Sequence, residues 1–280
     1  MDPLIQNEGD YLATGFRDVD SAATAKMMQC LGFLDSLPSF QAYKVWVLEK
    51  IGLRPGDIFA DLGCGLGFDV LRAASSLVPS GLSIGVDCSQ ALLTAARKRA
   101  SGHSNVDFVL ADIHQLPFAD GLLSSCKIDR TLQHANDPVA ILRGAFRIIH
   151  PGGTIACSEP DWTTFSIDDT DRSCVQEIEE FWSSSFRNPS IGRQLANYLP
   201  GVGFADISVH TSSLIAKSFE SSNRVFDLLQ TAVRLFEATG SNRALEWARR
   251  AQDSDRANRI TSSVTLFTYV AKKPLPEVEN

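Results

Sequence analysis

Short apolar runs alternate with amphipathic stretches through the middle of the chain. The runs cover residues 58–62, 82–86, 106–110, 122–128 and 154–159, and segments with helical spacing of apolar residues cover about 66–78, 91–100 and 137–149. Apolar runs of this length are typical of strands that are buried on both faces of a parallel sheet. The alternation therefore predicts a doubly wound α/β fold with helices on both sides of the sheet.

The segments on either side of this core are predicted to be mainly helical. Helices are expected within 20–53 and over 169–186, 190–199 and 220–252, and further strands over 205–211 and 263–273. Because 220–252 lies between two strands, it is expected to project from the sheet as an insertion. We therefore divide the chain into an N-terminal helical arm (1–50), a core (51–215), a helical insertion (216–258) and a final core strand (259–274), with the arm and the insertion forming a lid.

A glycine-rich turn joins the first predicted strand to its helix. In FADLGCGLGFD (59–69) the strand ends at Asp61, and Gly63, Gly65 and Gly67 form the turn. Glycines let the chain bend tightly and let backbone amides approach a ligand. A dinucleotide loop has the spacing G-x-G-x-x-G, whereas this loop reads G-x-G-x-G and places Asp69 in the first helical turn, where it would repel a diphosphate. The loop is therefore unsuited to NAD, and a purely structural turn is the alternative.

Two further carboxylates follow the next two strands. Asp87 ends the second strand, 26 residues after Asp61, and can accept hydrogen bonds from both hydroxyls of a ribose; the alternative is a carboxylate that stabilises a helix N-terminus. Ser89 is a good N-cap for the helix that follows. Asp112 follows the third strand and can accept from an exocyclic amine, unless it is a turn residue. The carboxyl ends of parallel strands meet at one edge, so these acids are expected to surround one ligand.

The net charge and the cysteines limit the classes of function. The 280-residue chain has a formal net charge of −7, and its basic clusters at 97–99 and 249–250 fit solvated helix faces. Nucleic acid is not an expected partner, because phosphate contacts need clustered Lys and Arg. No apolar run approaches the roughly 18–20 residues that span a bilayer, and the N-terminus lacks the basic and apolar segments of a signal peptide. Six scattered cysteines without a CxxC pair are expected to be buried, reduced thiols of a cytoplasmic protein, with disulfides or a metal site as the alternative.

An ordered set of motifs carries a family resemblance over about residues 55–160. D-L-G-C-G-L-G, G-V-D-C-S, A-D-I-H-Q-L-P-F, L-Q-H-A-N-D-P and H-P-G-G-T resemble the class I methyltransferases that depend on S-adenosylmethionine (SAM), and are similar to the ubiquinone/menaquinone type that acts on small molecules. The resemblance implies a Rossmann-like, seven-stranded sheet with an antiparallel last hairpin and a helical lid. It also implies SAM as the cofactor.

The same resemblance assigns residues to parts of the cofactor. It places Gly63, Gly65 and Gly67 against the methionine part, Asp61 near the amino group and Asp87 on the ribose. By the same resemblance Asp112 and Ile113 hold the adenine, Cys88 lies along it, and Cys64 and Asp129 are further cofactor-binding residues. The family commonly reads F-D-x-V at the fourth strand, where this chain has Leu123-Ser124-Ser125-Cys126. This departure is expected to alter a structural contact and not to affect cofactor binding.

Few residues need to take part in the reaction itself. Methyl transfer from a sulfonium is an in-line displacement, so the protein mainly aligns the reactants and excludes water. His134 is the candidate general base, because imidazole titrates near neutral pH; a structural histidine is the alternative. Arg130 either binds an acidic acceptor or pairs with Asp129 or Glu159. Glu159 either orients the acceptor or makes a structural hydrogen bond or ion pair.

The remaining candidates concern the acceptor and the lid. Trp162 is expected to wall the acceptor pocket, Arg187 to face the cleft or cap a helix, and Tyr11 and Phe16 to close over SAM. The predicted reaction moves the SAM methyl to an oxygen or nitrogen of an apolar or aromatic secondary metabolite and releases S-adenosylhomocysteine. Two alternatives remain: a SAM-binding fold used for non-methylating chemistry, such as a cyclase or decarboxylase, and a non-catalytic SAM-binding module. No metal site is evident, and a monomer and a homodimer are both compatible with the sequence.

Overall fold

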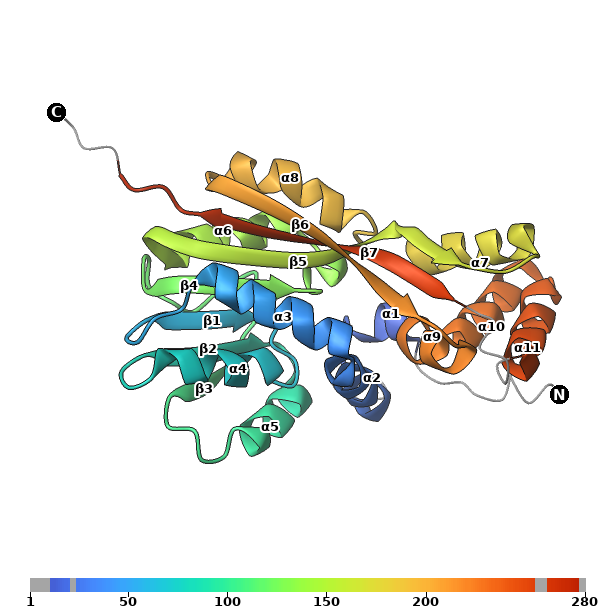
Figure 1. Ribbon diagram of the computed structural model, residues 1–280, viewed down its shortest axis with the longest axis horizontal. Coiled ribbons are helices and arrows are strands. Elements are labelled where there is room, and N and C mark those ends of the chain that lie inside the picture. The colour runs from blue at the N-terminus through green and yellow to red at the C-terminus, as the bar shows by residue number, and fades with distance from the viewer. Residues whose placement is uncertain (1–10, 21–23, 255–260, 277–280) are drawn as a thin grey trace.

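The computed structural model describes residues 11–20, 24–254 and 261–276. Its central sheet has seven strands in the order β3-β2-β1-β4-β5-β7-β6 (Figure 1). The strands are β1 (Ile58–Leu62), β2 (Leu82–Asp87), β3 (Val106–Leu110), β4 (Leu123–Asp129), β5 (Ile149–Ile167), β6 (Ala205–Ala216) and β7 (Ser262–Lys272). β1 to β5 pair in parallel, and β7 lies antiparallel between β5 and β6. The predicted Rossmann-like sheet with an antiparallel last hairpin is confirmed.

Helices cover both faces of the parallel part of the sheet. The helices of the described chain, including those that lie elsewhere, are α1 (Leu12–Gly15), α2 (Thr24–Ser36), α3 (Pro38–Ile51), α4 (Phe68–Leu77), α5 (Gln90–Arg99), the 3₁₀ turn η1 (Leu132–His134), α6 (Pro138–Ile148), α7 (Arg172–Ser184), α8 (Ile191–Val202), α9 (Phe219–Phe226), α10 (Leu228–Thr239) and α11 (Arg243–Ser254). α3 and α4 share an apolar cluster with Phe59 of β1, whereas α6 and α8 share another with Ala60 and Leu62. Neighbouring strand residues therefore face opposite layers, as the two-residue period requires.

Local signals set several of the helix ends. Ser89 is the N-cap of α5, and its hydroxyl accepts from the backbone N–H of Leu92 at 3.1 Å, which confirms the predicted cap. Asp137 caps α6 in the same way. Gly52 ends α3 in the left-handed conformation that glycine adopts without steric strain. These caps aim α5 and α6 away from the carboxyl edge of the sheet.

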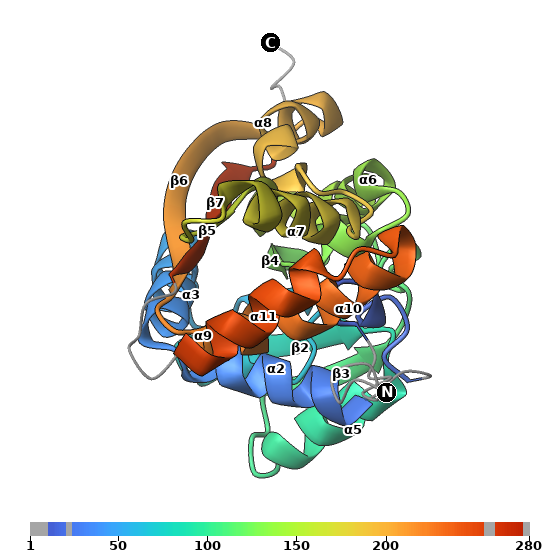
Figure 2. The ribbon, with the colours of Figure 1, turned by 90° about the vertical axis from the view of Figure 1, so that its right-hand side faces the viewer.

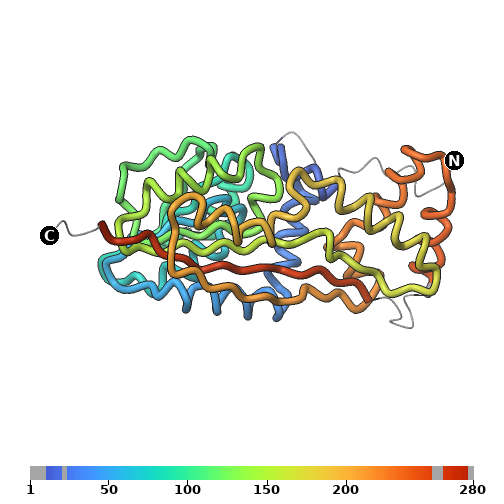
Figure 3. The backbone as a smooth tube through the Cα atoms, turned by 90° about the horizontal axis from the view of Figure 1, so that it is seen from above, coloured from blue at the N-terminus to red at the C-terminus, as the bar shows by residue number. Residues whose placement is uncertain are grey.

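β5 and β6 are longer than the sequence predicted, whereas β7 has the predicted length. The expected strands at 154–159 and 205–211 are parts of β5 (Ile149–Ile167) and β6 (Ala205–Ala216). Both continue because β7 lies between them and pairs with each, so that Ser262 pairs with Ile167 and also with Ala216. Seen from above, the three strands run along most of the molecule (Figure 3). The apolar pattern did not show the extension because polar residues at 163–164 and a register shift between Asp161 and Ser166 interrupt β5.

The far end of these long strands carries α7, α9, α10 and α11 (Figures 1 and 2). The N-terminal arm packs beside them: the backbone N–H of Leu12 donates to Asp227 at 3.0 Å, and Lys26 pairs with the same carboxylate at 2.9 Å. One apolar cluster joins the arm, α7 and α9–α11. The domain boundaries and the lid stay predictions. Among the described helices, none has the length and apolar character that a membrane span requires.

Candidate functional site

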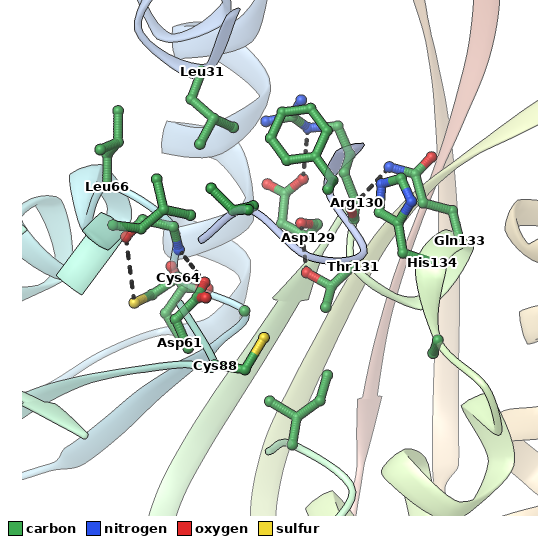
Figure 4. A pocket seen from close by; sticks show the side chains of 18 of the residues that line it. Leu31, Asp61, Cys64, Leu66, Cys88, Asp129, Arg130, Thr131, Gln133 and His134 are labelled. Atoms are coloured by element: carbon green, nitrogen blue, oxygen red, sulfur yellow. Dashed lines mark hydrogen bonds and ion pairs between the residues drawn. The ribbon is translucent and has the colours of Figure 1, made fainter. Parts of the chain in front are cut away.

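The main cavity, of about 350 Å³, lies at the carboxyl ends of β1, β2 and β4. It opens where the strand order reverses between β1 and β4, which is the usual ligand position in an open α/β sheet. Its residues form two groups that face each other (Figure 4). The glycine-loop end comprises Asp61, Gly63, Cys64, Gly65, Asp87, Cys88, Asp112 and Ile113. The arginine end comprises Phe16, Arg17, Arg130, Gln133, His134 and Arg187.

The glycine loop is open to the cavity at two of its three glycines. Gly63 and Gly65 have φ values of 81° and 52° and line the cavity, and a side chain at Gly63 would collide with Thr131. Gly67 lies behind the loop, where an added Cβ would be 2.8 Å from the Phe108 ring. The structure thus does not place Gly67 with the cavity-lining residues. Its role is to let α4 begin close against the sheet.

Asp87 organises the loop from the end of β2. Its carboxylate accepts from the backbone N–H of Gly65 at 2.8 Å and from that of Ser89 at 2.9 Å. Burial raises the pKa of Asp87, and these amides oppose that rise. Because Asp87 also lines the cavity, one side chain both holds the loop and faces the ligand space.

The residues that the resemblance assigns to the adenine also reach the cavity. Asp112, Ile113 and Cys88 line it, and Asp112 accepts from the backbone N–H of His114 at 2.9 Å. All six cysteines are free thiols, and Cys88 is exposed whereas the other five are buried. The expectation that all six thiols are buried is therefore wrong for Cys88, which directly follows β2 at the rim of the cavity.

A buried cluster of charges lies beneath the glycine loop. Lys127 of β4 is fully buried, and its Nζ is 2.5 Å from Asp69 and 2.7 Å from Asp129. Asp61 is 4.0 Å from the same atom. Lys44 of α3 also pairs with Asp69, and it lies 3.4 Å from Asp129. Three carboxylates therefore share two ammonium groups, and all five residues line the cavity.

Burial and pairing act in opposite directions on the pKa values of this cluster. Burial would lower the pKa of Lys127, but the three carboxylates raise it well above its usual value. Burial would raise the pKa of Asp69 and Asp129, but Lys127 and Lys44 hold both below the ordinary range. Asp61 is farthest from Lys127, and burial raises its pKa to about 6. Asp61 is thus the carboxyl group least neutralised by the two lysines.

This cluster changes one argument made from the sequence and adds two residues. The charge of Asp69 is paired with Lys44, Lys127 and Arg72, so it does not by itself repel a diphosphate. The case against NAD then rests on the glycine spacing. Lys127 and Lys44 were not among the predicted site residues. The signal for Lys127 is a lysine inside an apolar strand, since a buried lysine needs a partner.

Arg130 marks the start of the arginine end. It has a φ of 52°, its Nε donates to Asp129 at 3.3 Å, and its guanidinium lies 5.1 Å from the centre of the Phe40 ring. The predicted pairing with Asp129 is present, and the side chain still lines the cavity. Arg187 also lines this end, so its predicted position at the cleft agrees with the structure.

His134 lies between two aromatic rings at this end. Its ring centre is 5.8 Å from that of Phe16 and 5.6 Å from that of Phe186, and its Nδ1 is buried with no hydrogen-bond partner in the described chain. Burial lowers the pKa of His134 to about 3, and the charges of Arg17, Arg130 and Arg187 act in the same direction. The imidazole is therefore neutral at pH 7 and is a weak base, which counts against the role of general base.

Glu159 and Tyr11 lie outside the cavity lining. The Glu159 carboxylate, buried in β5, accepts from the backbone N–H groups of Thr131 and Leu132 at 2.7 and 2.6 Å, and burial raises its pKa to about 8. It fixes the loop that carries Arg130 and His134, which is the structural alternative considered from the sequence. Tyr11 is buried, and its hydroxyl is 3.3 Å from Thr231. Of the two predicted lid residues, Phe16 alone lines the cavity.

A smaller inner cavity, of about 50 Å³, adjoins the arginine end. It shares Phe16, Arg130, Gln133 and His134 with the main cavity. Its remaining lining residues are Leu12, Cys30, Leu34, Phe40, Pro160, Trp162, Trp182, Phe186, Leu214 and Val225. Trp162 belongs to this wall, and its Nε1 donates to Gln133 at 2.7 Å. Trp162 therefore lines the inner cavity and not the main one, and its role as a wall of the acceptor pocket stays a prediction.

Comparison with known sequences identifies the family. Residues 53–198 match the model of a methyltransferase domain, which is more than half of the chain. An uncharacterized 37.1 kDa protein in a transposon of Streptomyces fradiae is 33% identical over 270 residues, covering 96% of this chain and 78% of that protein. The demethylmenaquinone methyltransferase of Staphylococcus aureus is 28% identical over 137 residues, covering 48% of this chain and 57% of that enzyme.

Solved structures share the fold at low sequence identity. Phosphoethanolamine N-methyltransferase 2 of Haemonchus contortus, in complex with phosphomonomethylethanolamine and S-adenosylhomocysteine, aligns with a TM-score of 0.61 at 17% identity, over 92% of this chain and 60% of that one. The [4+2]-cyclase SpnF aligns with a TM-score of 0.57 at 18% identity, over 95% of this chain and 99% of that one. Together with the family model and the cavity at the switch point of the sheet, these matches establish that the chain belongs to the class I SAM-dependent methyltransferases.

Proposed function

We propose that this protein transfers the methyl group of SAM to an oxygen or nitrogen of a small, apolar or aromatic acceptor and releases S-adenosylhomocysteine. The observation that carries the proposal is the pairing of two unlike ends in one cavity. The glycine-loop end suits a cationic nucleoside, and the arginine end opens into an aromatic cavity. Family membership supports SAM as the ligand of the first end.

The glycine-loop end fits the chemistry of each part of SAM. Asp87 and Asp112 are carboxylates at strand ends, suited to ribose hydroxyls and an exocyclic amine. Gly63 and Gly65 keep the loop free of side chains beside them. Asp61 is poorly neutralised by the lysines and is suited to an ammonium group. The set matches a ligand that carries both an adenosine and a positively charged amino acid.

The arginine end would orient the acceptor and exclude water. SAM brings an activated methyl group, so the protein contributes alignment more than proton transfer. Because His134 is a weak base, we propose that it contacts the acceptor as a neutral hydrogen-bonding group. Glu159 acts indirectly, because it holds the backbone of Thr131 and Leu132 in place.

Methyl transfer can be tested with SAM that is labelled in its methyl group. We expect label to move from SAM into a metabolite of an apolar extract, with an equal amount of S-adenosylhomocysteine formed. Asp87→Ala removes a carboxylate that lines the cavity, so we expect it to reduce this transfer. Asp168→Ala changes an exposed aspartate outside the cavity lining and is the matched control. Absence of both labelled product and S-adenosylhomocysteine would contradict the proposal.

The labelling experiment and a melting experiment together separate the two alternative functions. A SAM-dependent rise in the melting temperature reports binding, because a ligand that binds only the native state stabilises it. Binding together with a changed metabolite that carries no label would favour a cyclase or decarboxylase. Binding with no changed metabolite would favour a non-catalytic SAM-binding module.

A further inference from the structure

We propose that the acceptor is a small planar acid, with its ring in the inner cavity and its ionised group facing Arg17, Arg130 and Arg187. This inference rests on the proposed methyl transfer and names the chemical class of the acceptor. Nothing in the family match or the fold alone specifies that class. Three features of the arginine end carry it: the shape of the inner cavity, two unpartnered polar atoms, and an excess of positive charge.

The inner cavity is small, and flat rings form much of its wall. Its volume is about 50 Å³, and one water needs roughly 10–15 Å³ by this measure, so a group of only a few heavy atoms enters. Trp162 and Phe186 are stacked with ring centres 4.4 Å apart, and Trp182 meets both edge-on. Such a wall accommodates the edge of one flat ring better than a long flexible chain.

Two buried polar atoms on this wall have no partner in the described chain. They are Nδ1 of His134 and Nε1 of Trp182, whose side chain is 1% exposed. A buried polar group without a hydrogen bond costs about 1–3 kcal/mol, so a group of this kind normally has a ligand atom or an ordered water as its partner. Trp Nε1 can only donate, which requires an acceptor atom on the ligand. An acceptor that is apolar in its body and carries an oxygen atom would fit this wall, and that oxygen could partner one of the two atoms.

Positive charge exceeds negative charge around this opening. Arg17 after α1, Arg130 after β4 and Arg187 before α8 line the main cavity beside His134, and each of them disfavours its protonation. Arg17 donates to the backbone carbonyl of Ser185 and forms no ion pair with an acidic residue of the described chain. These three guanidinium groups are an anion-binding arrangement.

The nearby carboxyl groups do not offset these arginines. Asp129 accepts from Arg130 but is also shared with Lys127 and Lys44, and it pairs with neither Arg17 nor Arg187. Glu159 lies behind the loop and outside the cavity lining, where its carboxyl group accepts from the backbone N–H groups of Thr131 and Leu132 and burial raises its pKa to about 8. An acceptor that carries an ionised oxygen would supply the missing negative charge.

An ionised acceptor also accounts for a site with no strong base. Transfer to this oxygen forms one O–C bond while the S–C bond breaks, and the electron pair of that bond passes to sulfur. No proton leaves the acceptor during the step, because the acceptor binds already ionised. The weakly basic His134 is then sufficient as a hydrogen-bonding neighbour.

The test uses matched probes and the full chain saturated with S-adenosylhomocysteine. Calorimetry compares three acids with their uncharged amides: benzoate with benzamide, phenylacetate with phenylacetamide, and 1-naphthoate with 1-naphthamide. We expect at least one acid to bind ten times or more tighter than its amide. Amides that bind as tightly as the acids in all three pairs, or no binding by any acid, would overturn the proposal.

Variants assign the charge and the ring to their places. Arg17→Gln combined with Arg187→Gln should weaken the acid about tenfold and leave the amide unchanged, whereas Arg143→Gln, on the exposed side of α6, should change neither. Val225→Phe should weaken acid and amide alike by filling the inner cavity, and Cys30→Met is a milder version if the first unfolds. Acid affinity that is unchanged in the arginine variants, or probe affinity that is unchanged in both filling variants, would contradict the proposal.

The titration of S-adenosylhomocysteine itself keeps the two proposals apart. If that ligand fails to bind, the proposed methyl transfer fails before any acid is tested. If it binds and the labelled methyl is found only on molecules that were uncharged before the transfer, with no labelled methyl ester of an acid, methyl transfer stands and the acid acceptor is rejected.

Discussion

The two ends of the cavity are built in different ways. The glycine-loop end comes from one stretch of chain, from Asp61 to Ile113, in which each residue lies at or shortly after the carboxyl end of a strand. The arginine end combines the N-terminal arm, the loop after β4 and the segment before α8. In the function that we propose, local strand–turn–helix geometry binds the cofactor that the family shares. The proposed acceptor pocket is assembled from distant segments, which can vary independently of the cofactor site.

The two ends also differ in charge and in rigidity. Beneath the glycine loop, three carboxylates are cross-linked by Lys127 and Lys44 in a buried network. At the arginine end, Arg17 and Arg187 are exposed. Buried ion pairs fix geometry, whereas exposed arginines remain available to a ligand. The predictions below test this contrast between a fixed cofactor site and an adaptable acceptor site.

The largest effect on stability is expected in the buried charge cluster beneath the glycine loop. Lys127→Met removes the cation that Asp69 and Asp129 share and leaves buried carboxylates underpaired. Breaking a buried pair in this way costs about 3–5 kcal/mol. Urea unfolding should show a loss of this size, while Lys98→Met, on the exposed face of α5, should change little. A loss below about 1 kcal/mol would mean that the network does not make the glycine-loop end rigid.

Asp87 should be the most important single side chain for the cofactor. Asp87→Ala removes both the carboxylate that faces the cavity and the acceptor for Gly65 and Ser89. We expect the affinity for S-adenosylhomocysteine to fall about 100-fold, equivalent to about 2.7 kcal/mol. Calorimetry of Asp87→Ala and of the Asp168→Ala control measures the difference. An affinity within threefold of the parent protein would reject the assigned role.

Gly67 tests whether the loop depends on packing behind it. Gly67→Ala places a Cβ 2.8 Å from the Phe108 ring at a φ of 74°, whereas Gly102→Ala has a similar φ of 98° with no atom within 4 Å. The left-handed conformation alone costs roughly 1 kcal/mol, and the collision should add about 1–2 kcal/mol at Gly67. Thermal unfolding of the two variants compares them. Equal losses would show that the contact with Phe108 relaxes freely.

The smallest effect is expected in how the unfolding free energy depends on pH through His134, at the arginine end. The pKa of His134 is lowered in the folded protein to about 3, so the unfolded chain, with a pKa near 6.5, binds the proton first as pH falls. The stability contributed by the neutral histidine is therefore present above pH 6.5 and is lost toward pH 3. Between pH 7 and pH 5, the parent protein should lose on the order of 1 kcal/mol more unfolding free energy than His134→Gln. Parallel pH profiles of the two proteins would contradict the lowered pKa.

Much of the fold and one end of the cavity followed from local patterns. The order of strands and helices, the Ser89 cap and the cavity positions of Gly63 and Gly65 could be predicted because each depends on neighbouring residues. The lengths of β5 and β6 could not, since pairing with β7 sustains both strands through polar sequence. Gly67 was assigned to the ligand and Glu159 was left with two alternatives, and in both cases the neighbours in space point to a structural role.

The sequence by itself determined the parallel core, the glycine turn and the three strand-end acids of the cofactor site, because strand, turn and acid follow one another along the chain. Only the tertiary structure decided that Lys127 and Lys44 pair with those acids, that Trp162 walls a separate inner cavity, and that three arginines gather beside His134. The physical reason is the distance along the chain. Burial, pairing and enclosure arise between segments that the periodicity of the sequence does not connect.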